Sequence, residues 1–545
     1  MLPMIYVIAK GDRVFKMINL KSQSINWAIK SVQKDFDTYL FPMPFEYEAI
    51  EYDKDCVVDH IASLDIYNAG IREYRTALTP KGTKGFRVAT QLDPIDTIIS
   101  LAIMYEIADD IERSRLPKNQ LEVFSFRMKP EKDGSLYDPD FDWPAYQKKT
   151  RAIADSGIYS HVVVTDISDF YPSIYLHDIE TVLSDALEPS GRKGYGQVLI
   201  NYIKAMYLNQ THKGLPVGPQ FSRPIAELIL DEIDRELNKR GITFVRYVDD
   251  FILFTQSEGA AYESLSLLAQ VLYDRRGLKL NDKKTEILNL PKFRQRYLKD
   301  SEEFEQNTIL DSFAELLNEL GIDQDPYEDI NPSDLSVEDW ERLKSINLKS
   351  LIEQEVSKDD PDGFVISFVL ANLARLDDTE IVNLILSEKS IIKLFPRLRT
   401  IINYLERVRD FSQNQRDSIG RKIIGFVDDS YVSVLNFNRM WFMHLFTKND
   451  EWDNADQFGA IYEKYTDNET RRETLLARGR AHDIDFFRRQ KYENLDTNTW
   501  LRRSFLAAVS CLPESERKPW YKARSLRSRD FLDQVVEKWA QKKHF

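Results

Sequence analysis

The feature that most constrains the fold of this chain is a pair of adjacent aspartates between two short apolar runs. Residues 242 to 254 read Ile-Thr-Phe-Val-Arg-Tyr-Val-Asp-Asp-Phe-Ile-Leu-Phe, and the acids are Asp249 and Asp250. Runs of β-branched and aromatic residues predict a β-hairpin with the acids at or beside its turn. Adjacent residues on a regular strand point to opposite faces, so both acids can serve one site only where the backbone bends. We expect one principal ligand and one supporting acid, while a solvated Asp-Asp turn is the alternative that the tetrapeptide alone leaves open.

A third acid ends a second apolar run. The stretch from His161 to Ile167 predicts a buried strand that delivers Asp166 at its carboxyl end. Burying a carboxylate there is costly unless it binds something. Mg²⁺ takes oxygen ligands in an octahedral array and keeps positions open for phosphate oxygens, so carboxylates from two neighbouring strands predict a two-metal site. Such a site aligns a 3′-hydroxyl with a nucleotide α-phosphate, and most of the protein's contribution is positioning and electrostatics.

Segments suited to phosphate binding accompany these acids in the sequence. Residues 214 to 222 form a loop rich in Gly and Pro that opens a helix, whose first N–H groups suit a phosphate or a base edge. Residues 74 to 88 alternate around a Pro- and Gly-containing turn, which predicts a basic hairpin. Residues 277 to 287 give a turn with two lysines before another short strand. Each segment alone could be an ordinary loop or turn between elements. Together with the three acids, the segments suggest a phosphate-binding site.

Composition bounds the class of protein. A chain of 545 residues is too long for one compact core, so we expect two or three domains. The net charge of −14 argues against non-specific coating of nucleic acid, so any nucleic-acid site is local. Only two cysteines occur, Cys56 and Cys511, which excludes a disulfide framework and fits a reducing cytoplasm. No apolar run approaches the roughly 18 residues of a membrane helix, so we expect a soluble intracellular protein.

The chain divides by character into four predicted regions. We expect an N-terminal extension over residues 1–50, a catalytic region over 51–295, an acidic linker region over 296–340 and a helical domain over 341–545. Residues 323 to 339 hold seven acids, two prolines and no base, which marks the boundary. Beyond it come apolar-periodic helices without strand signals or a sharp repeat, as in an irregular helical-repeat array.

The end of the chain is its most basic stretch. From Arg517 to Phe545 nine Lys and Arg residues face three acids, with Trp520, Tyr521 and Trp539 interleaved. This pattern predicts binding to nucleic-acid phosphates, and a solvated terminal helix is the equal alternative.

The order and spacing of these segments resemble the reverse transcriptases. Residues 164–174 resemble their motif A, 214–222 motif B, 247–250 motif C and 277–285 motif D. With the basic hairpin, the resemblance covers roughly residues 50 to 290. It implies a right-hand polymerase palm and fingers, dNTPs as substrates and DNA as product. It also implies that Asp166, Asp249 and Asp250 bind two Mg²⁺ ions, with Mn²⁺ as the alternative metal.

Further roles are implied position by position. Lys81 and Arg87 would meet the incoming triphosphate, Tyr171 would gate against a 2′-hydroxyl, and Lys284 is a candidate proton donor to pyrophosphate. The other nucleotide-binding positions that the resemblance implies are Asp169, Phe170, Gly218 and Pro219. Val217 departs from the pattern, because many reverse transcriptases have Gln there for a polar contact near the nucleotide and template.

The layout as a whole resembles the abortive-infection and related defence reverse transcriptases of bacteria. The fold class implied is α+β, a right-hand polymerase palm and fingers followed by an all-α HEAT-like helical-repeat domain. The resemblance further implies phage defence, protein-primed and untemplated DNA synthesis, and a homo-oligomer. Two alternatives stay open: a reverse transcriptase templated by a partner non-coding RNA, and a catalytically idle scaffold, which the intact acids and Tyr171 disfavour.

Protein priming requires a side-chain hydroxyl that reaches the metals and then moves away. A tyrosine phenol, with a pKa of about 10, is easier to deprotonate than an aliphatic alcohol. Among the 26 tyrosines, Tyr6, Tyr39 and Tyr47 lie in the N-terminal segment that suits this movement. Each of them could equally be an ordinary packed aromatic.

Overall fold

The structure is a computed structural model. It describes residues 17–34, 40–120, 122–207, 212–298, 336–448, 451–452, 454–490, 498–523 and 530–542, with a few single positions between 309 and 320. Two compact units share the chain. The first draws on residues 1–37, 54–74 and 92–298, and the second on 38–53, 75–91 and 299–545. Two segments that we expected in the N-terminal extension and the fingers, 38–53 and 75–91, thus cluster with the C-terminal helices.

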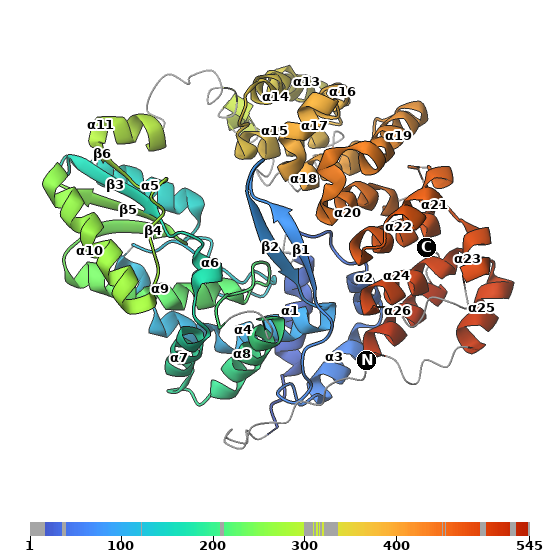
Figure 1. Ribbon diagram of the computed structural model, residues 1–545, viewed down its shortest axis with the longest axis horizontal. Helices are drawn as coiled ribbons and strands as arrows, with labels where there is room; N and C mark the ends of the chain where they lie inside the picture. The colour runs from blue at the N-terminus through green and yellow to red at the C-terminus, as the bar shows by residue number, and fades with distance from the viewer. Residues whose placement is uncertain are drawn as a thin grey trace. The chain divides into compact units, whose positions relative to one another are not determined.

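A four-stranded antiparallel sheet forms the centre of the first unit (Figure 1). Its strands are β3 (His161–Asp166), β4 (Thr243–Tyr247), β5 (Asp250–Thr255) and β6 (Glu286–Asn289), in the order β4-β5-β3-β6. The predicted hairpin is confirmed as β4 and β5, and the predicted buried strand as β3. Apolar side chains on one face of the sheet share a core with α5 (Trp143–Ala154), for example Val162, Val245 and Ile252 with Tyr146.

Long helices complete this unit. One of them is α4 (Pro94–Ser114), which begins where the Asp93 carboxylate accepts the Ile95 N–H at 2.9 Å. α10 (Glu258–Arg276) ends at Gly277, whose φ of 62° suits glycine. The remaining helices are α1 (Ser22–Lys34), α3 (Lys54–Ser63), α6 (Phe170–Ser173), α7 (Leu176–Leu187), α8 (Lys193–Tyr207), α9 (Ser222–Lys239) and α11 (Leu290–Phe293).

The second unit contains a two-stranded hairpin and many helices. The predicted basic hairpin is confirmed as β1 (Arg75–Pro80) paired with β2 (Phe86–Gln91). Its alanines, Ala77 and Ala89, share one apolar core with residues of the C-terminal helices. Apart from α2 (Glu46–Tyr52), these helices are α13 (Val337–Ser345), α14 (Leu348–Ser357), α15 (Gly363–Arg375), α16 (Val382–Ile385), α17 (Glu388–Leu394), α18 (Leu398–Arg407), α19 (Gln413–Asp429), α20 (Asn436–His444), α21 (Ala455–Lys464), α22 (Asn468–Arg480), α23 (Ile484–Gln490), α24 (Thr499–Ala508), α25 (Glu514–Ala523) and α26 (Phe531–Lys542).

The described residues beyond 336 form no strand, so the prediction of an all-helical C-terminal region is confirmed for them. One helical stretch of this region is interrupted. Residues 391–405 divide into α17 and α18 because Pro396 lies between them in a short 3-10 helix, where proline cannot continue the α-helical hydrogen bonding. None of the helices in the described part of the chain is both long enough and apolar enough to cross a membrane.

Candidate active site

The sheet brings the three predicted acids together at one end of β3 and β5. Asp166 lies directly opposite Asp250 in the antiparallel register. Directly opposed residues have side chains on the same face, about 4.5–5.5 Å apart at Cβ. Asp249 lies in the two-residue turn that joins β4 to β5. Asp166 is buried, Asp249 is half-buried and Asp250 is exposed, so the acids line a surface that is open to solvent on one side.

The turn itself has an unusual backbone. Val248 has a φ of 56°, in the left-handed region that β-branched residues rarely adopt. Three hydrogen bonds hold the turn. Val248 N–H donates to Ser125 Oγ at 2.9 Å, Arg246 donates to the Val248 carbonyl at 2.7 Å, and Ile167 N–H donates to the Asp249 carbonyl at 3.3 Å. A strained residue persists only where its surroundings fix it, and such residues concentrate at functional sites.

Lys284 forms an ion pair with the first of the acids, Asp166. Its Nζ lies 2.5 Å from Asp166 Oδ2, and this hydrogen bond raises the pKa of Lys284 above its usual value. Lys284 therefore carries its proton at neutral pH. It follows Asn281, whose N–H donates to the Asp166 carbonyl at 2.9 Å, so the turn after α10 is joined to the end of β3.

The three acids offer the oxygen ligands that divalent cations prefer, but their side chains do not converge closely enough to enclose an ion. Asp166 Oδ1 is buried and has no hydrogen-bond partner among the described residues, an arrangement that a bound cation would satisfy. In the same part of the chain, however, no three His, Cys, Asp or Glu side chains stand close enough to form a metal cage. The strand register places suitable ligands, and their side chains would need to turn inward to share an ion.

Motif A residues lie between the acids and the Gly- and Pro-rich loop. Asp169 has a φ of 45° and starts the short helix α6, in which Phe170 is buried and Tyr171 is half-buried. The Tyr171 carbonyl accepts the Leu215 N–H at 2.9 Å, which joins motif A to that loop. Burial raises the pKa of Tyr171, so its phenol stays neutral. The rings of Tyr171 and Phe170 pack edge to face, with their centroids 5.6 Å apart.

The Gly- and Pro-rich loop contains two glycines in backbone conformations that favour glycine, Gly214 with a φ of 114° and Gly218. Gly218 has a φ of 133°, which residues with a Cβ rarely adopt. Pro219 is buried, and its carbonyl accepts the N–H of Ser222 at 3.1 Å as α9 begins. Gly218 thus sets the path of the backbone just before the helix. A polar side chain in place of Val217, which is half-buried, is not needed for this geometry.

Aromatic rings surround Tyr247, the residue that leads into the turn. Its ring centroid lies 5.1 Å from that of Trp143 and 5.7 Å from that of Tyr146, both on α5. Burial raises the pKa of Tyr247. Trp143 is an exposed large aromatic close to the acids, and the sequence prediction did not include it.

Two predicted nucleotide contacts belong to the second unit. Lys81 and Arg87 are exposed on the β1–β2 hairpin, where Lys81 N–H donates to the Gly85 carbonyl at 2.7 Å. Their contact with a triphosphate stays a prediction. Of the predicted priming residues, Tyr6 and Tyr39 lie outside the described residues. Tyr47 is buried on α2, which favours the alternative that it is a packed aromatic.

The aromatic residues of the basic C-terminal stretch are not available for base stacking. Trp520, Tyr521 and Trp539 are all buried, and Tyr521 donates its hydroxyl hydrogen to the Leu506 carbonyl at 2.7 Å. Arg517 is also buried. These three aromatics are core residues of the second unit, because large rings bury much apolar area. Binding of nucleic-acid phosphates by the basic stretch stays a prediction.

Sequence reasoning missed a buried ionic cluster beneath the turn. Its members are Glu112, Arg115, Arg127, Glu227, Asp234 and Arg246. Two positions could have revealed it. Arg246 lies within an apolar strand, and Glu227 lies on the apolar side of α9. Charged residues are almost never fully buried without partners, so each one implied a partner.

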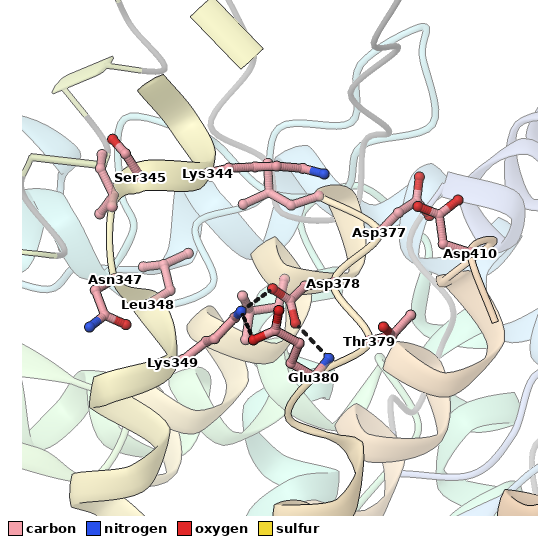
Figure 2. A pocket seen from close by; sticks show the side chains of 13 residues that line it. Lys344, Ser345, Asn347, Leu348, Lys349, Asp377, Asp378, Thr379, Glu380 and Asp410 are labelled. Atoms are coloured by element: carbon pink, nitrogen blue, oxygen red, sulfur yellow. Dashed lines mark hydrogen bonds and ion pairs between the residues drawn. The ribbon is translucent and has the colours of Figure 1, made fainter. Parts of the chain in front are cut away.

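A hollow in the second unit offers different chemistry (Figure 2). Its volume is about 580 Å³, and it is lined by residues 344–349, Leu373, 376–380 and Asp410. Lys349 pairs with Asp378 at 3.1 Å and with Glu380, so these two acids share one cation. The hollow contains none of the predicted catalytic residues.

Comparison with known protein families finds a match for part of the chain. The protein-family model of reverse transcriptase (RNA-dependent DNA polymerase) matches residues 79–310. These residues include all four motifs and the three acids. No curated protein sequence matches the chain. Among the solved structures that match is the telomerase of Candida albicans in complex with the TWJ fragment of telomeric RNA. It is 13% identical, covers 72% of this chain and 70% of that one, and has a TM-score of 0.31, too low to support an argument. Residues 79–310 are thus similar to a reverse transcriptase domain, and this match supports the chain being an enzyme of the RNA-directed DNA polymerase or nucleotidyltransferase type.

Proposed function

We propose that the chain synthesises DNA from dNTPs by two-metal nucleotidyl transfer at Asp166, Asp249 and Asp250. The observation that carries this proposal is the register that sets Asp166 opposite Asp250 and leaves Asp249 in the adjoining turn. The unpartnered buried oxygen of Asp166 supports it. The three carboxylates would hold two Mg²⁺ ions, or Mn²⁺ in their place. Such ions lower the pKa of the primer hydroxyl and neutralise the leaving pyrophosphate.

The chain's own residues orient the nucleotide in this proposal. Tyr171, which lies within motif A, has a neutral aromatic side chain, and this suits exclusion of a 2′-hydroxyl. Lys284 keeps its proton beside Asp166, which suits donation to the pyrophosphate. Asp169, Phe170, Gly218 and Pro219 shape the backbone on which the nucleotide would rest. The roles of Lys81 and Arg87 rest on the motif resemblance alone.

The biological part of the proposal is anti-phage defence in the bacterial cytoplasm by a homo-oligomer. We also propose protein-primed, untemplated synthesis and a HEAT-like arrangement of the C-terminal helices. The support is the layout: a reverse transcriptase domain is followed directly by a region in which every described regular element is a helix. A second candidate, copying of a partner non-coding RNA, is favoured by the RNA-dependent activity of the matched family.

One experiment separates the two candidates. Purified protein, freed of nucleic acid by nuclease, is given one labelled dNTP and Mg²⁺, with and without added RNA, and then denatured. Label that stays with the polypeptide without RNA, and that DNase releases, supports protein priming. Incorporation only with RNA, giving a complementary product, supports templated synthesis. No incorporation under any of these conditions, with all four dNTPs and a primed RNA template included, contradicts the proposed function.

A further inference from the structure

The acidic turn rests on a buried network of charged side chains in the first unit. Arg115, Arg127 and Arg246 are each at most 3% exposed, and Glu227 and Asp234 are equally buried. Glu112 completes the set through ion pairs with Arg115 at 3.1 Å and Arg127 at 3.5 Å. Three cations therefore face three anions. Complete pairing is what permits so many charges to be buried, because each isolated charge would carry a large desolvation penalty.

This network holds Val248 from both sides. On its amino side, the Val248 N–H donates to Ser125 Oγ at 2.9 Å. On its carboxyl side, the Val248 carbonyl accepts from Arg246 at 2.7 Å. The two peptide units that define the left-handed conformation of Val248 are therefore each fixed by one side chain. Asp249 and Asp250 follow immediately, so their directions depend on the conformation of Val248.

The two arms of this clamp meet at one carboxylate. Ser125 Oγ donates to Glu227 Oε1 at 2.6 Å, while Arg246 pairs with Glu227 Oε2 at 3.0 Å. Arg115 donates to the same Oε2 at 2.9 Å. Glu227 lies on α9, the helix that opens from the Gly- and Pro-rich loop. A shift of that helix would therefore move both supports of the turn together.

Asp234, which lies about two helical turns after Glu227 on α9, makes a second contact with Arg246. Arg246 donates from Nε to Asp234 Oδ1 at 2.8 Å and from NH2 to Asp234 Oδ2 at 2.5 Å. This bidentate contact fixes the plane of the guanidinium, which a lysine could not reproduce. The third nitrogen of Arg246 is thereby aimed at the Val248 carbonyl.

We infer that Ser125, Glu227 and Arg246 are positioning residues for nucleotide transfer, which hold Val248 left-handed and thereby aim Asp249 and Asp250. This inference rests on the proposed function of the two acids. None of the three residues needs to touch substrate or metal. Their contribution is geometric, and displacement of a reacting group by about 1 Å can reduce a rate by about 100-fold.

The test compares Ser125→Ala with wild type. Removal of the hydroxyl leaves Glu227 and Arg246 in place but frees the Val248 N–H. We expect kcat to fall by about 10- to 100-fold. We also expect the KM for dNTP to change little, and the Mg²⁺ concentration for half-maximal rate to rise severalfold. The thermal melting of the variant reports whether it is folded under the assay conditions.

Ser100→Ala is the matched control. Ser100 is likewise buried in the first unit, and its hydroxyl donates to the Thr97 carbonyl at 2.9 Å within α4. A purely structural role for Ser125 predicts that both variants lower the melting temperature and leave kcat and the Mg²⁺ midpoint unchanged in the folded fraction. Should Ser125→Ala fail to fold, Ser125→Cys keeps a side chain of similar size with weaker hydrogen bonding. It should give an intermediate kcat.

The outcomes distinguish this inference from the proposed function. If Asp249→Asn is inactive while folded Ser125→Ala, or Ser125→Cys in its place, keeps the wild-type kcat and Mg²⁺ midpoint, the positioning role is wrong and the proposed function stands. If Asp249→Asn itself retains full activity, the proposed function fails first. A selective loss of kcat with a raised Mg²⁺ midpoint in the Ser125 variant, absent from Ser100→Ala, supports the clamp.

Discussion

Tyr171 is fixed through its backbone and its ring. Its carbonyl accepts the Leu215 N–H, its ring meets Phe170, and burial keeps its phenol neutral. A side chain held in this way can exclude a hydroxyl group by volume, since it has little freedom to move aside. The position of such a ring five residues after Asp166 is readable from the sequence, but its rigidity is not.

Replacement of Tyr171 by Ala should therefore admit ribonucleotides. We expect the preference for dNTP over the matching rNTP, measured as the ratio of kcat/KM values, to fall by at least about tenfold. Tyr171→Phe serves as a control, because it removes only the hydroxyl and keeps the aromatic ring. An unchanged ratio in a folded Tyr171→Ala variant would show that the discrimination lies elsewhere.

Glu122 gives the first unit a pH-dependent stability. Burial, and then the nearby charge of Asp234, raises its pKa to about 7, and its Oε2 accepts from Asn238 at 3.2 Å. An acid whose folded pKa is raised binds more protons when folded than when unfolded. Its contribution to the free energy of unfolding is therefore lost as pH rises from its ordinary value of 4.5 towards 7.

Glu122→Gln should remove this dependence. The variant should gain stability relative to wild type as pH rises from 5 to 8, because only the wild type must then bury a charge. Urea unfolding at both pH values measures the difference. Since Glu122 is only partly buried, we expect a small effect of known sign. A difference between the two proteins that is independent of pH would contradict the raised pKa.

At the scale of elements, the strands and long helices follow from local patterns, and the charged interior does not. Apolar runs in the sequence predict β3, β4 and β5. The side-chain network around Arg246 depends on which helix packs under which strand. No local pattern contains that information. The aromatics of α25 and α26 show the same limit, because their interleaving with charged residues in the sequence does not reveal that the rings are buried.

Trp539→Ala tests whether the buried aromatic residues of α25 and α26 stabilise the second unit. The Trp539 ring stacks on Phe45 at a centroid distance of 5.7 Å and is buried. Loss of a buried tryptophan should lower the free energy of unfolding of the second unit by about 3–5 kcal/mol. The salt dependence of nucleic-acid binding by the folded variant should not change. A flattened salt dependence without loss of stability would show that Trp539 contributes to nucleic-acid binding and not to the core.

At the scale of the whole molecule, the two units do not follow the order of the sequence. Residues 38–53 and 75–91 belong to the N-terminal half of the sequence, but they form part of the second unit. Arg472, which is 2% exposed, pairs there with Glu46 at 2.6 and 2.9 Å. Arg75 lies 4.5 Å from the centroid of the Trp500 ring. Composition could place a boundary at the acidic segment, but it could not show that earlier segments cross it.

A fragment of residues 341–545 should therefore be unstable alone. It lacks Glu46, and a buried arginine that loses its partner costs about 3–5 kcal/mol. It also lacks the β1–β2 hairpin that shares its core. Circular dichroism with thermal melting measures the result. Cooperative melting at the temperature of the same unit in the full chain would show that the crossing segments contribute little.

The measurement that tests the central claim most directly is DNA synthesis by Asp249→Asn at matched folding. Asp249 is half-buried in a turn and is not a core contact, so the variant should melt close to wild type. It should lose at least about 1,000-fold in dNTP incorporation, because a carboxylate that would hold the metals becomes a neutral amide. Wild-type incorporation by a correctly folded Asp249→Asn protein would contradict the two-metal site. Absence of synthesis by both proteins, over a full range of primers, templates and divalent ions, would favour an idle scaffold instead.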